Sequence, residues 1–273
     1  LFGIGGRSSI LQEDKGVEGD TLFARSDYNS RMGVVGLTHT RTLGANNFIY
    51  TTISISGNGS GNVYHENLAP GEMDLAVRGT ADLAKWTLRA TSTLNSRINA
   101  NHKLRTGIIL TNDHYRMSSA SWNYDQGYME THLDQDGSAN TLQAFSSWKW
   151  RWNDRWTMTS GMHFLYYQAN ATASVEPRLA VRYQMRPDQA FTLGAGLHSK
   201  TQSLMTLHAQ RTDPLGNVTR PNGQLGPTRA LHAVAGYELM LTEDIQLKAE
   251  AYYQYLYQLP VENRLTSSYC DCN

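Results

Sequence analysis

The chain has 273 residues, enough to bury a sizeable core as one or two domains. Its 24 Lys and Arg balance its 24 Asp and Glu, so nothing indicates a nucleic-acid partner, which normally brings a basic excess or stripe. No stretch approaches the roughly 18 apolar residues that a membrane-spanning helix needs. The 15 Tyr, 6 Trp and 23 Gly favour strands and turns.

Ten strands are predicted along the chain. In order, they are Met32–Leu43, Phe48–Gly57, Ala84–Ile98, Lys103–Asp113, Thr141–Trp152, Trp156–Tyr167, Val175–Met185, Ala190–Lys200, Arg229–Leu241 and Asp244–Tyr257. Most exceed the 5 to 6 residues or so that are usual in globular proteins and match the roughly 9 to 11 of a strand that crosses a bilayer. Short connections alternate with long ones, the longest being 58–83, 114–140 and 201–228. Such sorting is typical of an outer-membrane β-barrel, with periplasmic turns and extracellular loops.

The last strands alternate polar and apolar side chains with a period of two, which places the polar ones on one face. A barrel in lipid turns its apolar face outward and its polar face to the lumen. The residues predicted to face the lumen are Glu176, Arg178, Arg182, His198, Lys248 and Glu250. We expect the charged ones to pair with one another or with a plug.

Aromatic residues gather near the predicted strand ends. Trp148, Trp150 and Trp152 share one face before a short turn, and Trp156 follows that turn. Tyr253, Tyr255 and Tyr257 approach the opposite end of the last strand, by the end of the sheet that carries the long loops. Because Trp and Tyr favour membrane interfaces, we predict that both sets belong to girdles; the alternative is an aromatic cluster in a soluble core.

The sequence carries no strong catalytic or cofactor motif: HExxH, GxSxG and P-loop patterns are absent, and the nine histidines are scattered. We therefore predict no enzyme activity, cofactor or metal. Asp134–Ser138 resembles a calcium loop but lacks its full spacing, so we expect a polar turn in a long loop. Cys270 and Cys272 are too close for an unstrained disulfide, and a Cys-x-Cys metal half-site lacks partner ligands.

Several segments resemble the barrels of TonB-dependent outer-membrane receptors of the Bacteroidota type. They are Arg25–His39, Leu94–Gly107, Ser174–Tyr183, Leu193–Ser199, His232–Tyr237 and Leu247–Tyr257. The motifs within them that together carry the resemblance are Glu176-Pro-Arg178, Leu197-His-Ser199 and Tyr252-Tyr-Gln-Tyr-Leu-Tyr257. The resemblance reaches to about Asn263. It implies a 22-stranded barrel with an N-terminal plug, binding of a scarce nutrient at the extracellular face, and import driven by TonB.

From this resemblance we expect residues 1–273 to be one partial barrel domain, without a plug, in the outer membrane of a Gram-negative cell. The expected fold is all-β: about ten long antiparallel strands in an open curved sheet. The expected partners are outer-membrane lipid, the missing plug and remaining barrel strands, TonB through the parent receptor, and an unidentified nutrient. Two alternatives remain open, an outer-membrane β-barrel hydrolase and a soluble β-propeller or sandwich that acts as a binding module.

Overall fold

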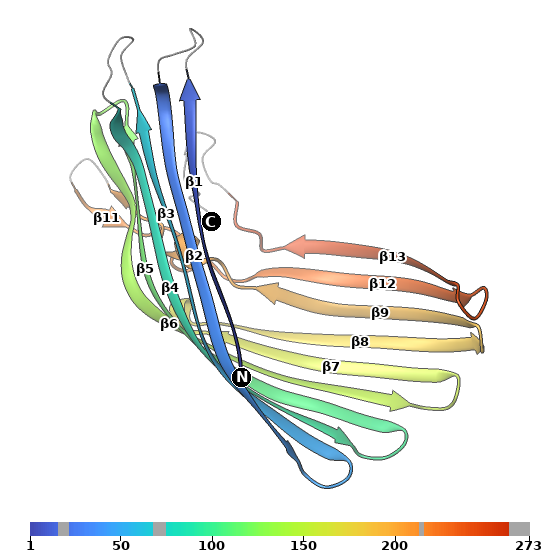
Figure 1. Cartoon of the computed structure of the whole chain (residues 1–273). Helices are drawn as coiled ribbons and strands as arrows, with labels where there is room; N and C mark the ends of the chain where they lie inside the picture. Colours follow the sequence, from blue (N-terminus) through green and yellow to red (C-terminus); the bar gives the residue numbers. More distant parts are fainter. Residues whose placement is uncertain (16–21, 68–74, 213–215, 262–273) are drawn as a thin grey trace.

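The computed structural model describes residues 1–15, 22–67, 75–212 and 216–261. Eleven antiparallel strands form one open sheet in which each strand pairs with its neighbours in chain order, and the sheet is strongly curved (Figure 1). The strands are β1 (Phe2–Lys15), β2 (Leu22–Thr42), β3 (Asn47–Glu66), β4 (Ala76–Arg97), β5 (His102–Asn123), β6 (Tyr128–Arg151), β7 (Trp156–Tyr167), β8 (Thr172–Arg186), β9 (Gln189–Lys200), β12 (Thr228–Met240) and β13 (Gln246–Tyr257). None of the helices in the described residues is long and apolar enough to cross a membrane.

The all-β open sheet is confirmed, but it holds eleven strands where the sequence predicted about ten. Strand β1 was not predicted. The connections predicted at 58–83 and 114–140 were largely wrong, because β3 continues to Glu66 and β6 begins at Tyr128. Asp134–Ser138, expected as a turn, lies inside β6. These outer strand segments are rich in Gly, Ser and Asn and lack the apolar alternation from which the strands were predicted. Their backbones nevertheless continue to pair.

Side chains in the short turns fix the hairpins. The Asn99 Oδ1 accepts hydrogen bonds from the backbone N–H groups of Asn101 and His102, each at 2.9 Å. Asn153 does the same for Arg155 and for Trp156, the first residue of β7, also at 2.9 Å each. A side-chain oxygen that substitutes for backbone acceptors is the reason that Asn favours tight turns.

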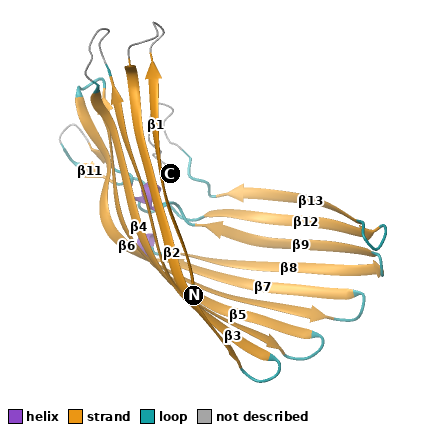
Figure 2. Cartoon of the chain, viewed as in Figure 1, coloured by secondary structure: helices purple, strands orange, loops and turns teal. Residues whose placement is uncertain are grey.

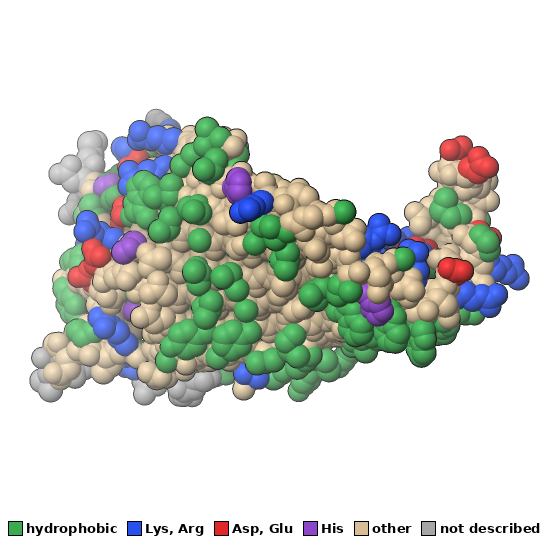
Figure 3. Space-filling view, turned by 90° about the horizontal axis from the view of Figure 1, so that it is seen from below, with side chains coloured by type: hydrophobic (Ala, Val, Ile, Leu, Met, Phe, Trp, Pro, Cys, Tyr) green, Lys and Arg blue, Asp and Glu red, His purple; other side chains and the backbone are tan. Residues whose placement is uncertain are grey.

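Cross-strand partners share a face of the sheet, so the register assigns every strand residue to one of two faces. One row joins Arg182 of β8 through Thr192 and Gly236 to Glu250 of β13; we call this the polar face. The next row, on the apolar face, joins Val181, Leu193, Ala235 and Ala251. Figure 3 shows hydrophobic side chains spread across the middle of one face, with charged side chains mainly toward its two ends.

The connection between β9 and β12 folds back over the sheet. It contains α1 (Leu204–His208), β10 (Arg211–Thr212) and β11 (Val218–Thr219), whereas the sequence predicted only a long loop. Figure 2 shows α1 and the short 3-10 helix η1 (Gln168–Asn170) as the helical elements beside the sheet. Leu207 of α1 is only 3% exposed and joins a small core. The buried strand residues of that core are Tyr115, Met117, Leu133, Ala139 and Tyr167.

Candidate functional site: the polar face of β7 to β13

A buried carboxylate lies on the polar face. Glu176 of β8 is 3% exposed. Its Oε1 accepts hydrogen bonds from the hydroxyls of Ser199 (2.6 Å) and Ser174 (3.2 Å). Its Oε2 lies 2.8 Å from Nη2 of Arg178 and 3.1 Å from Nδ1 of His163. A buried carboxylate is tolerated when it is paired and hydrogen-bonded in this way.

This network ties four neighbouring strands together. His163 of β7 contacts Glu176 through Nδ1 and places its Nε2 3.1 Å from Oε1 of Gln143 on β6. The pairing of β8 with β9 runs up to Arg178 and Gly196 and stops at Pro177, which has no N–H to donate. Ser199 of β9 reaches the carboxylate just beyond that point.

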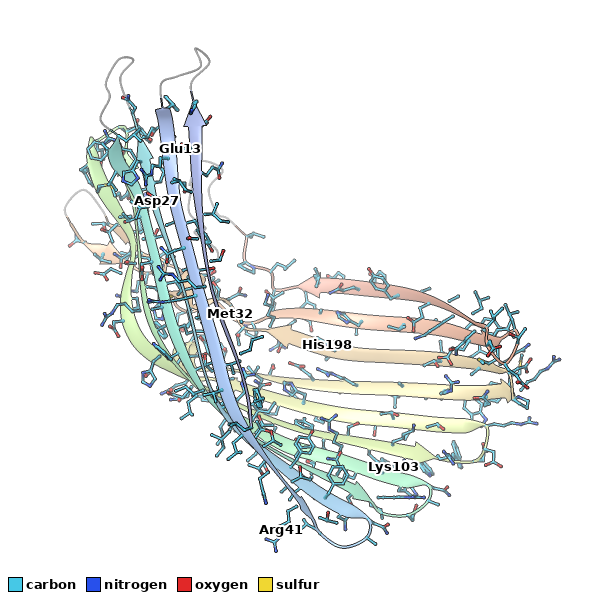
Figure 4. All side chains as sticks on the ribbon, viewed as in Figure 1. Glu13, Asp27, Met32, Arg41, Lys103 and His198 are labelled. Atoms are coloured by element: carbon cyan, nitrogen blue, oxygen red, sulfur yellow. The ribbon has the colours of Figure 1, made fainter. Side chains whose placement is uncertain are left out.

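The other residues predicted to face the lumen lie on the same face. Arg182 forms an ion pair with Glu238 of β12 at 2.8 Å. Lys248 pairs with Glu250 at 3.0 Å, and both side chains are more than half exposed. The His198 ring packs on His232 with the ring centroids 4.4 Å apart. Figure 4 labels His198 on β9.

Sequence reasoning missed several members of this cluster, namely Gln143, Ser174, Ser199, His232 and Glu238. Ser174 lies two residues before Glu176 on the same strand, whereas the others come from neighbouring strands that are distant in the chain; Arg182 and Glu238 are 56 positions apart. The alternation of polar residues marks their strands and faces, but it does not say which residue lies opposite which.

The predicted girdle tryptophans form a ladder on the apolar face. The ring centroids of Trp148 and Trp150 are 5.5 Å apart, and those of Trp150 and Trp152 are 5.4 Å apart. His102 extends the ladder from β5 and accepts a hydrogen bond from Nε1 of Trp148 at 3.1 Å. The remaining predicted residues are Trp156, which packs on Tyr183 at 4.5 Å, and Tyr253, Tyr255 and Tyr257 of β13, the last two stacked at 6.0 Å.

The cluster is not arranged for nucleophilic catalysis. A Ser-His-acid site needs the serine hydroxyl on the histidine, but Ser174 and Ser199 both bind Glu176, and His163 turns its second nitrogen to Gln143. A separate contact joins the hydroxyl of Ser121 to Nε2 of His132 at 2.7 Å, and it links β5 to β6 where their register shifts.

Two observations concern possible metal sites. Within the described ranges, no group of three or more His, Cys, Asp or Glu side chains is placed to hold a metal ion. Cys270 and Cys272 lie outside the described residues.

A comparison with protein families decides what this sheet is. The family model described as "TonB dependent receptor-like, beta-barrel" matches residues 3–272. The chain belongs to this family. TonB-dependent receptor barrels are outer-membrane proteins, and the open sheet of eleven strands is a partial barrel of that kind. The family consists of receptors and transporters, which supports a role other than catalysis.

Solved structures of low identity share the fold. The siderophore receptor PiuA from Acinetobacter baumannii has a TM-score of 0.61 at 11% identity, over 85% of this chain and 41% of that one. The open form of the ferric-catecholate import receptor Fiu from E. coli K12 has a TM-score of 0.58 at 12% identity, over 92% and 41%. The copper transporter OprC has a TM-score of 0.53 at 13% identity, over 93% and 49%. The chain thus spans less than half the length of these structures.

A search of curated proteins found no match to the chain.

Proposed function

We propose that the chain forms part of the barrel of a TonB-dependent receptor that binds a nutrient at the cell surface and imports it across the outer membrane. The single observation that carries the proposal is the two-faced antiparallel sheet, formed by a chain whose sequence matches the family's barrel model over residues 3–272. A strand that crosses lipid needs one apolar face, and a receptor lumen needs a polar one.

In this proposal the polar face lines the lumen. Glu176, Arg178, Arg182, His198, Lys248 and Glu250 are its lumen-facing residues. The ion pairs among them support this role, because charges next to a lumen are expected to be paired or wet rather than turned to lipid.

The apolar face then contacts outer-membrane lipid, and its aromatic residues occupy the interfaces. The ladder of Trp148, Trp150 and Trp152, with Trp156 after the turn, belongs to the periplasmic side. Tyr253, Tyr255 and Tyr257 belong to the extracellular side, where β13 ends.

The proposed partners follow from the receptor role. Residues 1–273 act as one barrel domain, and a plug domain outside them contacts TonB. Further barrel strands pair with β1 and β13, each of which has one strand neighbour in the described sheet.

Deletion of the gene that encodes the chain, in its own host, tests the import role. We expect uptake of one nutrient by the deletion strain to fall to the level that the undeleted strain shows when it is treated with a protonophore. The reason is that import of this kind draws its energy from the inner membrane. The complete receptor should restore uptake, and the same receptor with its plug removed should not restore energy-dependent uptake.

If the uptake that is lost on deletion were insensitive to the protonophore, this result would contradict active import and favour a passive pore. Unchanged uptake of every nutrient that supports growth would contradict the transport role altogether.

A further inference from the structure

A groove of about 430 Å³ opens among β6, β7, β8, β9 and β12, beside the Glu176 network. Most of its lining residues lie on the polar face by register. This volume is within the roughly 300 to 1,000 Å³ of small-molecule pockets.

The floor of the groove is made of residues with little or no side chain. Gly161 lies on β7, Ala180 on β8, and Gly194 and Gly196 on β9. Neighbouring strands are about 4.8 Å apart, so the floor extends over roughly 10 Å. A flat patch of this width accepts a planar group larger than a single protein side chain.

Aromatic side chains border the floor on two sides. Phe145 and His163 contribute from β6 and β7, and the packed rings of His198 and His232 contribute from β9 and β12. Aromatic rings that flank a planar group bind it through offset or edge-to-face contacts. The groove is therefore shaped for a ring.

The groove exposes one cationic side chain, which is paired on one side with a buried carboxylate. Among the described residues that line it, Arg178 is the one with a permanent charge, and its side chain is 47% exposed. Glu176, its partner at 2.8 Å, is buried and does not line the groove. An arginine fork recognises a carboxylate with two parallel hydrogen bonds.

We propose that this groove binds a small planar organic anion. The carboxylate contacts Arg178, and the ring lies on the glycine floor between Phe145 and the His198–His232 pair. The assignment rests on the proposed function in one respect, because a ligand reaches this wall through the lumen.

The test uses the receptor that contains this chain, purified whole in detergent, with 4-fluorobenzoate as the probe and fluorine NMR line broadening as the readout. Neutral 4-fluorobenzamide is the matched ligand without the charge. We expect the benzoate to bind at least about tenfold more tightly than the benzamide, because only the benzoate engages the arginine fork.

The two glycine variants locate the site. A Cβ at Gly194 meets only ordinary contacts, 3.6 Å from Cβ of Ala180 and from O of Leu179. Gly194→Val therefore fills the groove without backbone strain, and it should weaken benzoate binding at least about tenfold. Gly236 lies on the same face outside the groove, with its nearest contact also at 3.6 Å, so Gly236→Val should bind like the unchanged receptor.

A third variant tests the arginine itself. Arg178→Lys keeps a cation beside Glu176 and loses the fork, so we expect benzoate binding that is severalfold weaker in a barrel that still folds. Retained binding in both Gly194→Val and Arg178→Lys would overturn the proposal, as would equal binding of the two probes. An unchanged receptor that imports its nutrient but binds no benzoate would overturn the groove assignment and leave the proposed function standing.

Discussion

At the scale of single residues, two carboxylates on the same face differ sharply in environment. Glu176 is 3% exposed and has four polar partners. Glu250 pairs with Lys248, and both side chains are more than half exposed. Removal of Glu176 takes the hydrogen-bond acceptor away from the hydroxyls of Ser174 and Ser199, whereas a solvent-exposed pair contributes little to stability.

We therefore expect Glu176→Ala to lower the free energy of unfolding of the assembled barrel by about 1 to 3 kcal/mol. Glu250→Ala, the matched change on the exposed pair, should cost less than about 1 kcal/mol. Urea unfolding in detergent, followed by the mobility shift between folded and unfolded barrel on gels, measures both. Equal costs would show that Glu176 is not the buried anchor of the network.

The two faces of the sheet predict a second difference in stability between variants. Ala195 of β9 lies on the apolar face, and Val234 of β12 lies one strand away on the polar face. Ala195→Arg should destabilise the barrel in bilayers by about 2 to 4 kcal/mol if the position is near the midplane, because the guanidinium is forced toward lipid. Val234→Arg should cost clearly less. The same unfolding experiment in vesicles decides, and a larger cost for Val234→Arg would reverse the assignment of faces.

The sequence was sufficient to predict which polar residues share a face of the sheet, but it was insufficient to predict which of them are in contact. Alternation with a period of two correctly placed Arg182 and Glu250 on one face, since parity along a strand needs no further information. It did not place Glu238 beside Arg182, or Ser199 beside Glu176, because those contacts depend on the register of strands that are distant in the chain.

At the scale of elements, the segment between β9 and β12 is held onto the sheet by a few specific contacts. Leu207 of α1 enters the core that Tyr115 and Met117 form with their neighbours. The hydroxyl of Tyr115 lies 2.8 Å from Nε2 of His208, and the backbone N–H of Gln210 donates to the carbonyl of His132 at 2.9 Å.

Leu207→Ala should release α1 from the sheet. Truncation of a buried leucine costs about 2 to 5 kcal/mol, which exceeds what a five-residue helix retains without tertiary packing. Amide hydrogen exchange over residues 203–208 should accelerate by orders of magnitude. Met205→Ala is the control, because Met205 is 47% exposed on the same helix; comparable acceleration in that variant would mean that Leu207 is not the anchor.

The docking of this segment should also weaken in acid. Burial, and then the nearby Arg220, lower the pKa of His208 below its ordinary 6.5. A lowered pKa in the docked state means that docking is fully stabilised above about pH 6.5 and loses stability as pH falls through the docked pKa.

We expect amide exchange in residues 203–212, corrected for intrinsic pH effects, to show weaker protection at pH 5 than at pH 7.5. His208→Gln keeps a neutral partner for Tyr115 and should reduce this difference. A pH difference that is unchanged in His208→Gln would exclude His208 as its source.

Element lengths were the least predictable feature of the fold. The membrane-length parts of the strands show alternation, because one side contacts lipid and the other does not. The outer parts, such as Gly59–Gly61 of β3, have small or polar residues on both sides, so the pattern ends although the hydrogen-bonded ladder continues. Strand β1 was missed for the same reason, since much of it is Gly, Ser and charged residues.

At the scale of the whole molecule, the sheet is open. Strand β1, of 14 residues, and strand β13, of 12 residues, form its two edges. An edge presents unpaired N–H and C=O groups, and each such group costs several kcal/mol in hydrocarbon. A partial barrel of this shape therefore gains stable membrane insertion only when further strands pair with both edges.

This leads to a prediction for the chain expressed alone behind a signal peptide, in a strain that lacks the parent receptor. We expect no protease-resistant, heat-modifiable species in the outer membrane, because the edges of β1 and β13 remain unpaired, and we expect the chain to be degraded or to aggregate. Co-expression of the remaining strands of the parent barrel should restore a folded species. A stable outer-membrane species formed by the chain alone would require β1 to pair with β13 or with a second copy, and it would show that stable insertion needs no further strands of a parent barrel.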